Sequence, residues 1–132
     1  MSAVLMRDVS RAGHELGRAR LHDLPDRLPL RDLLRARVEA DVAAYDQDPG
    51  PVFRGLVQPP DAMRHSDGFR MSRPRTLEAA PMIAAAHEAV RRGLLAVRVG
   101  ETTVDDLDAE VPVAEHDEIV TVLERSVVAR DA

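Results

Sequence analysis

Hydrophobic positions change their spacing several times along the chain, and each change indicates a different element. Residues 4–10 and 16–21 alternate loosely between apolar and polar positions on either side of a turn at Gly13, which predicts a β-hairpin. Over residues 30–45 the apolar side chains recur every three or four positions, with arginine and acidic residues between them. This spacing predicts an amphipathic helix whose charged face points to solvent.

A long irregular segment is expected after this helix. Residues 47–76 are rich in proline and glycine, a composition typical of loops and turns. Within them we expect one short strand, around residues 52–57. Residues 77–92 then predict a second helix, with Thr76 as its N-cap and Gly93 as its C-terminal stop. Pro81 fits this helix only near its start.

The last forty residues predict strands. Residues 94–99 form an apolar run, and residues 102–104 and 111–113 are short extended pieces. Residues 118–123 have the density of β-branched side chains that is typical of a buried strand. The order of these elements indicates an α+β fold.

Composition narrows the classes of protein to which the chain can belong. The 132 residues suffice for one domain with a single core, which must be mainly aliphatic because only Tyr45, Phe53 and Phe69 are aromatic. The absence of cysteine excludes disulfides, thiolate zinc sites and a cysteine nucleophile. With no long apolar run to span a membrane, we expect a cytoplasmic protein.

Charge argues against nucleic acid as the main partner. The formal net charge is −5, whereas affinity for a phosphate backbone comes largely from clustered cationic side chains. All 18 basic residues are arginine, which we interpret as the codon bias of a GC-rich, bacterial-type genome. The lack of lysine excludes a Schiff-base lysine, a P-loop lysine and a lysine acceptor for an isopeptide bond.

The second half of the chain resembles a known family. The sequence VRVGE at residues 97–101, followed by Val104, Leu107 and Val111 and then by EHDEIV at residues 115–120, is similar to the small sulfur-carrier proteins of molybdopterin and thiamine synthesis. That resemblance implies a β-grasp, or ubiquitin-like, mixed sheet packed on one main helix. It covers residues 1–46 and 94–130, so residues 1–132 would form a single ubiquitin-like domain in which residues 47–93 are an insertion containing the loop and the second helix.

The resemblance fails at the C-terminus. Sulfur carriers need a free Gly-Gly end, whereas Ala129 and Arg130 occupy the matching positions here and Asp131 and Ala132 follow them. A β-carbon and a charged side chain would obstruct the channel of an activating enzyme. We therefore expect a non-catalytic protein-interaction or adaptor domain without a cofactor. Two alternatives remain open: a sulfur carrier or conjugated modifier with a processed C-terminus, and a small enzyme or enzyme subunit that uses arginine and histidine from the insertion, including His65.

Several motifs resemble catalytic or metal sites without completing them. His14-Glu15 and His87-Glu88 begin like helical zinc motifs, but arginine stands where each needs its second histidine. The acidic residues between 105 and 110 lack the pattern of a calcium loop, so we interpret them as a solvated turn. His116-Asp117-Glu118 is expected to form a turn before the last strand, because neighbouring residues of a strand point to opposite faces.

The insertion is the expected binding locus. It contains histidine together with arginine, aromatic residues and methionine, and the last three are the types enriched at protein interfaces. The candidate binding residues are Phe53, Arg54, Arg64, His65, Phe69, Arg70 and Arg73. The competing interpretation is that the aromatic side chains simply fold back over the core. We expect a protein partner, no nucleic acid and no membrane, and self-association through a sheet edge is left open.

Overall fold

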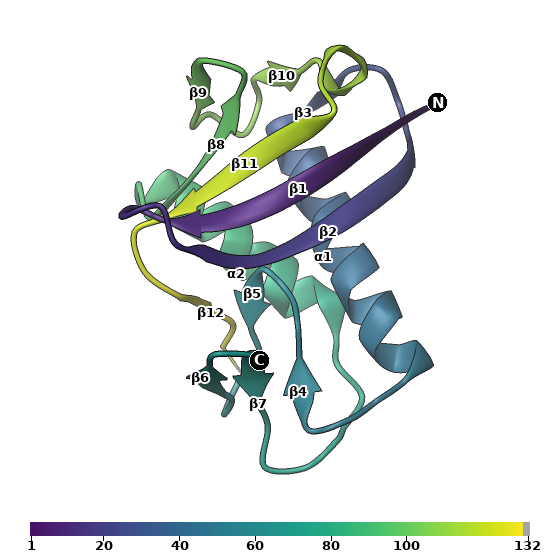
Figure 1. Ribbon diagram of the computed structural model, residues 1–132, viewed down its shortest axis with the longest axis vertical. Helices are drawn as coiled ribbons and strands as arrows, with labels where there is room; N and C mark the ends of the chain where they lie inside the picture. The colour runs from purple at the N-terminus through teal and green to yellow at the C-terminus, as the bar shows by residue number, and fades with distance from the viewer. Residues whose placement is uncertain (131–132) are drawn as a thin grey trace.

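The main sheet of the protein has five strands and brings the first and last long strands of the chain side by side. The computed structural model describes residues 1–130. Strands β1 and β11 run parallel at its centre, and the other neighbours are antiparallel (Figure 1). From one edge to the other, the strands are β2 (Glu15–Leu24), β1 (Ser2–Ser10), β11 (Glu118–Leu123), β8 (Leu95–Val99) and β9 (Thr102–Val104).

The expected hairpin and final strand are confirmed. In β1, Val4 and Met6 are buried and Leu5 between them is half-buried, as alternation requires. Met6 lies beside Ile119 of β11, so the two side chains enter the same core. Gly13 closes the hairpin with φ 92°, a conformation that strains other residues.

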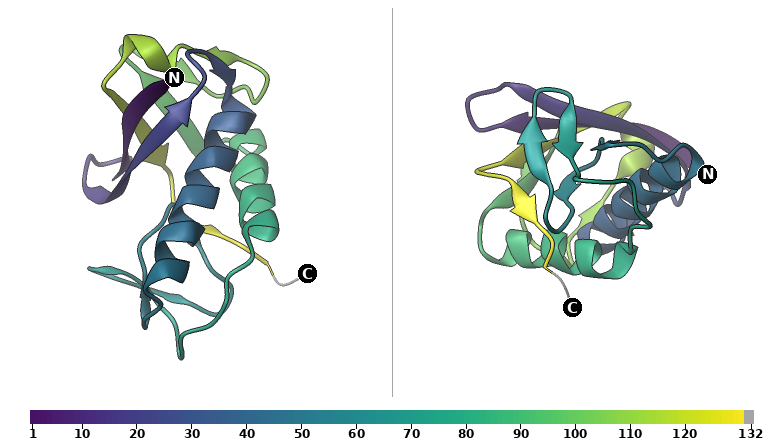
Figure 2. Two further views of the ribbon diagram at one scale, coloured as in Figure 1. Left: turned by 90° about the vertical axis from the view of Figure 1, so that its right-hand side faces the viewer. Right: turned by 90° about the horizontal axis from the view of Figure 1, so that it is seen from below.

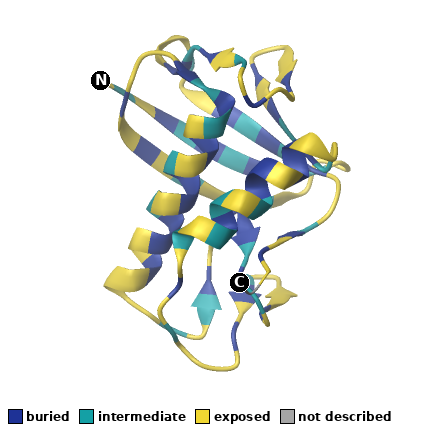
Figure 3. Ribbon diagram, turned by 180° about the vertical axis from the view of Figure 1, so that it is seen from behind, coloured by how far each residue is buried: buried dark blue, intermediate teal, exposed yellow. Residues whose placement is uncertain are grey.

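Two helices, α1 (Leu30–Gln47) and α2 (Ala79–Arg91), lie next to each other on one face of the sheet (Figures 2 and 3). The first confirms the helix expected over residues 30–45. Its apolar side chains are buried, but so are Arg37 and Asp41, which are one turn apart. The expectation that the charged residues of this helix face solvent is therefore wrong for these two, because Arg37 forms ion pairs with Asp41 and with Asp8 of β1 inside the core.

The second helix starts later than predicted. Glu78 occupies the N-cap position, so the assignment of the cap to Thr76 is wrong. Pro81 becomes the third helical residue, where its missing N–H costs no intrahelical hydrogen bond. Gly93, with φ 74°, follows the helix as expected, and the Leu94 N–H donates to the Ala89 carbonyl across it.

Residues 47–76 contain more regular structure than expected. Strand β5 (Val57–Gln58) pairs in parallel with β12 (Val127–Val128) near the C-terminus. Expecting a single short strand here is wrong, because strands of two or three residues are held by tertiary pairing and leave no alternation to detect. The remaining three form a small antiparallel sheet in the order β4 (Val52–Phe53), β7 (Gly68–Arg70) and β6 (Met63–His65).

The strand expected at residues 111–113 is also shorter than predicted. Strand β10 (Glu110–Val111) pairs with β3 (Leu28–Pro29), and the 3-10 helix η1 (Val113–Glu115) follows Pro112. Proline cannot donate to a ladder, which explains the early end of the strand.

The helices and both ends of the chain share one hydrophobic core, which confirms the α+β fold. No helix within residues 1–130 is long and apolar enough to cross a membrane.

Candidate functional site

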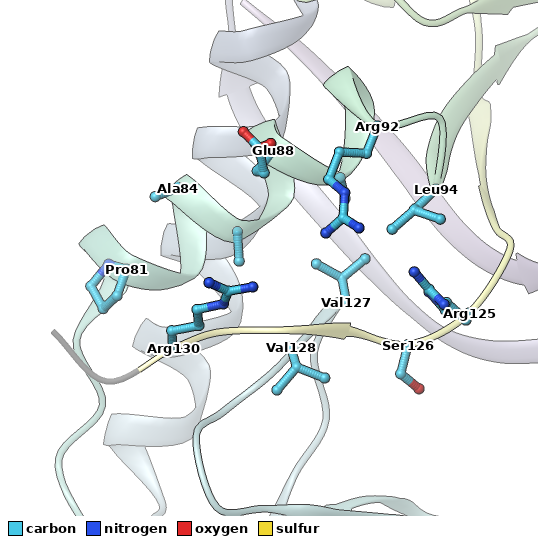
Figure 4. Close-up of a pocket in the computed structure, with 12 residues that line it drawn as sticks. Pro81, Ala84, Glu88, Arg92, Leu94, Arg125, Ser126, Val127, Val128 and Arg130 are labelled. Atoms are coloured by element: carbon cyan, nitrogen blue, oxygen red, sulfur yellow. The ribbon is translucent and has the colours of Figure 1, made fainter.

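A groove of about 790 Å³ runs between α2 and the segment that contains β12 (Figure 4). One wall is a stripe along α2 that includes Pro81, Ala84, Ala85 and Glu88, spaced at helical intervals. Alanine side chains are short, so this stripe leaves room beside the helix. A volume of this size falls in the range of ligand and peptide pockets in proteins.

Apolar side chains form much of the other wall. Val127 is buried and Val128 is 48% exposed, and both line the groove together with Leu94. The groove therefore combines an apolar surface on both walls with access to solvent.

Three arginines, Arg92, Arg125 and Arg130, surround this apolar surface. Figure 4 shows the guanidinium groups of Arg92 and Arg130 reaching over the space between α2 and β12. Within residues 1–130 none of the three forms an ion pair, whereas the neighbouring Glu88 pairs with Arg91 at 3.5 Å. The groove thus has an excess of positive charge in a protein whose net charge is negative.

The segment beside the groove is held in place by β5. The Ala129 N–H donates to the Gln58 carbonyl at 2.9 Å, and Val127 and Ala129 are both buried. In a sulfur carrier, the residues that match 129–130 would be a free Gly-Gly end. Here Ala129 is buried and hydrogen-bonded to β5, while Asp131 and Ala132 lie outside the described residues.

The predicted binding residues of the insertion divide into two groups. Phe53 and Phe69 are almost fully buried, and the Phe53 ring meets Tyr45 edge-on with 5.8 Å between centroids. Both side chains belong to the core, but Phe69 also lines a smaller pocket together with Arg54 and Arg64. The assignment of Phe53 as a surface contact residue is therefore corrected. Direct binding stays a prediction for Phe69 and for the exposed members of the set: Arg54, Arg64, His65, Arg70 and Arg73.

Arg64 connects the insertion to the groove segment. Its guanidinium carbon lies 4.4 Å from the centroid of the Phe69 ring, and its Nε donates to Ser126 Oγ at 3.1 Å. Partial burial lowers the pKa of Arg64, although attraction to Asp8 opposes that shift. Of the remaining residues, Arg70 forms an exposed ion pair with Asp67 at 3.5 Å.

A smaller pocket of about 200 Å³ lies between β2 and the insertion, with Arg37 among its lining residues. The two terminal nitrogens of Arg37 each donate to one oxygen of Asp8 at 2.7 Å, and its Nε donates to both oxygens of Asp41 at 3.0 Å. Asp41 also accepts the Leu56 N–H at 2.9 Å. All three charged side chains are buried, so this cluster joins β1, α1 and the insertion.

Two carboxylates share a single buried cation in this cluster. Burial raises the pKa of Asp41 to about 6, because the pull of Arg37 and of the Leu56 N–H does not fully offset the lost solvation. Burial also opposes the charge of Arg37, but the attraction of Asp41 and Asp8 is stronger and its pKa lies above the ordinary value. Removing any one of the three side chains would leave buried charge without its partner, so we interpret the cluster as structural.

The incomplete motifs have ordinary structural roles. His87 Nε2 lies 2.9 Å from the Arg31 carbonyl oxygen. In the acidic turn, Arg31 pairs with Asp108 at 2.6 Å and Arg27 with Glu110 at 3.2 Å. Within residues 1–130, no group of three or more histidine and acidic side chains is arranged to hold a metal ion.

Comparison with known proteins finds no relative: no family model, no curated protein and no solved structure matches the chain.

Proposed function

We propose that the protein is an interaction domain that binds another protein in the groove between α2 and β12. The observation that carries this proposal is the placement of three arginines without ion-pair partners in residues 1–130 around an apolar surface. Arginine beside buried apolar area is the composition of interface centres, where planar guanidinium groups recognise carboxylates.

The chemistry of the groove supports binding better than catalysis. Its polar side chains are the three arginines, Glu88 and Ser126, and Ser126 accepts a hydrogen bond from Arg64 rather than facing a general base. His65, on which the enzyme alternative depends, is exposed on β6 and does not line the groove.

We also propose that the sheet and α1 form a β-grasp-like domain. Two features support this assignment: the first and last long strands lie parallel at the centre of the sheet, and α1 follows the first hairpin. The carrier alternative is less well supported, because residues 127–129 are paired with β5 and an activating enzyme would first have to detach them.

Photo-cross-linking in the native host tests the proposed function. A photoreactive amino acid replaces Ala84, which is exposed on the groove stripe of α2, or Ala44, which is exposed on α1 away from the groove. We expect a protein adduct from position 84 that is lost when Arg92 and Arg125 are changed to glutamate, and no such adduct from position 44. Equal labelling at both positions, or labelling that survives the charge reversal, would contradict the proposal.

A further inference from the structure

The edge of β12 that does not pair with β5 indicates how a partner binds in the groove. Consecutive residues of a strand direct their backbone groups to opposite edges. The parallel pairing of Val127 with Val57, and the hydrogen bond from the Ala129 N–H to Gln58, assign residues 127 and 129 to the β5 side. The N–H and carbonyl of Val128 therefore point to the other edge, where β12 has no neighbouring strand in residues 1–130.

Two observations place this edge at the groove. Ser126, Val127 and Val128 line it, so a strand added to β12 would lie over the alanine stripe of α2. The Val127 side chain points toward α2, whereas the exposed Val128 side chain points away from it (Figure 4). Arg125 and Arg130 flank β12 at its two ends, and Arg92 reaches toward it from α2 (Figure 4).

We infer that the partner contributes an acidic, extended segment that pairs with Val128 and adds a strand to β12. The inference rests on the proposed function and specifies its partner. Backbone hydrogen bonds to Val128 would set the register, as in other cases of strand addition. Small apolar side chains of the segment fit the alanine stripe, and its carboxylates are drawn to the three arginines that surround the groove.

The size of the site limits the segment to a few residues. A strand rises about 3.3 Å per residue, so five residues span roughly 16 Å. Three turns of α2 cover a similar length, since each turn rises about 5.4 Å. A helical partner would pack against the same stripe but would leave the Val128 N–H and carbonyl unused. Strand addition is the mode that satisfies them.

The test uses a synthetic heptapeptide, Gly-Glu-Val-Glu-Val-Glu-Gly with blocked ends, titrated into the full-length protein. Nuclear magnetic resonance follows the amide signals of Val128 and of the groove. We expect saturable shifts centred on Val128 and Arg92, and affinity that falls as salt is added. The same peptide with lysine in place of glutamate is the charge control and should not bind.

Val128→Pro tests the mode of binding, because it removes the N–H on the free edge and keeps the Val127 and Ala129 groups that pair with β5. We expect about a fivefold loss of affinity, the effect of one hydrogen bond. Val128→Thr, which keeps the N–H, should bind nearly normally. Should Val128→Pro perturb folding, methylating the central amide nitrogens of the peptide removes donors from the ligand side and should also weaken binding.

The outcomes separate the inference from the proposed function. Unchanged affinity with the proline variant and the methylated peptide would overturn strand addition, and so would a peptide that does not bind at millimolar concentration. In either case, arginine-dependent cross-linking at position 84 would still support a protein-binding groove. Loss of that cross-linking would contradict the proposed function itself.

Discussion

Arginine has opposite environments in two regions of this molecule. Arg37 is fully buried between the sheet and α1 and makes ion pairs with Asp8 and Asp41. In the groove, Arg92 and Arg125 make no ion pair with any residue in 1–130. A buried guanidinium is retained only when its partners replace the lost water, whereas a solvated one keeps its donors available. Pairing and burial, rather than residue type, distinguish the arginine of the core from the arginines of the groove.

The largest expected effect tests the buried side of this comparison. Arg37→Met removes the cation and leaves Asp8 and Asp41 buried without it, so we expect the free energy of unfolding to fall by about 3–5 kcal/mol. Arg35→Met is the matched control, since Arg35 is exposed on the same helix, and it should change stability by less than about 0.5 kcal/mol. Urea unfolding measures both. Similar values for the two variants would show that the buried cluster contributes little.

The raised pKa of Asp41 predicts that the stability of the buried cluster depends on pH. The pKa is 3.8 without perturbation and about 6 in the fold, so the folded state holds a proton that the unfolded state has already released. The contribution of Asp41 to stability is thus fully present below pH 4 and declines as the pH rises to 6. The expected loss is roughly 3 kcal/mol.

Asp41→Asn isolates this effect, because the amide does not titrate. The unfolding free energy of the unsubstituted protein minus that of this variant should decrease from pH 4 to pH 6 and then stay constant. Asp46→Asn, at an exposed position of the same helix, should show no such trend. A difference that increases with pH would mean that the pKa of Asp41 is lowered instead.

Removing charge from the groove should affect binding and leave stability unchanged. For the double variant Arg92→Gln and Arg125→Gln we expect about a tenfold weaker affinity for the acidic heptapeptide, or about 1.4 kcal/mol, and a smaller dependence on salt. The matched control, Arg20→Gln with Arg98→Gln, changes two exposed arginines of the main sheet and should bind normally. Calorimetric titration and thermal melting provide the two measurements. A large loss of stability in the groove variant would make these arginines structural.

The smallest expected effect concerns Ser126, which links the insertion to the groove through Arg64. Ser126→Ala removes the acceptor for Arg64 Nε, which also packs on Phe69. We expect a loss of about 0.5–1 kcal/mol, as for a single hydrogen bond near the surface. Ser72→Ala, at an exposed position, is the control. Faster hydrogen exchange at Ala129 in Ser126→Ala alone would show that the contact helps to hold β12.

Prediction from the sequence succeeded where an element is long and its periodicity regular. The helix over residues 30–45, the first hairpin and the strand at 118–123 follow from spacing, and all three are confirmed. It failed for β5 and β12, which have two residues each and exist because they pair across the chain. The groove was missed for the same reason: its arginines at positions 92, 125 and 130 become neighbours only when β12 packs beside α2.

Local pattern by itself determined the α+β class, the main helix and the long strands, because the burial of one face imposes a repeat that can be read along the chain. Tertiary structure alone decided which charges are buried and which remain free. Arg37 and Arg35 belong to the same amphipathic helix, yet one meets Asp8 of a distant strand and the other meets solvent. The solvation of a charge depends on what lies around it in space, and no spacing along the sequence records that.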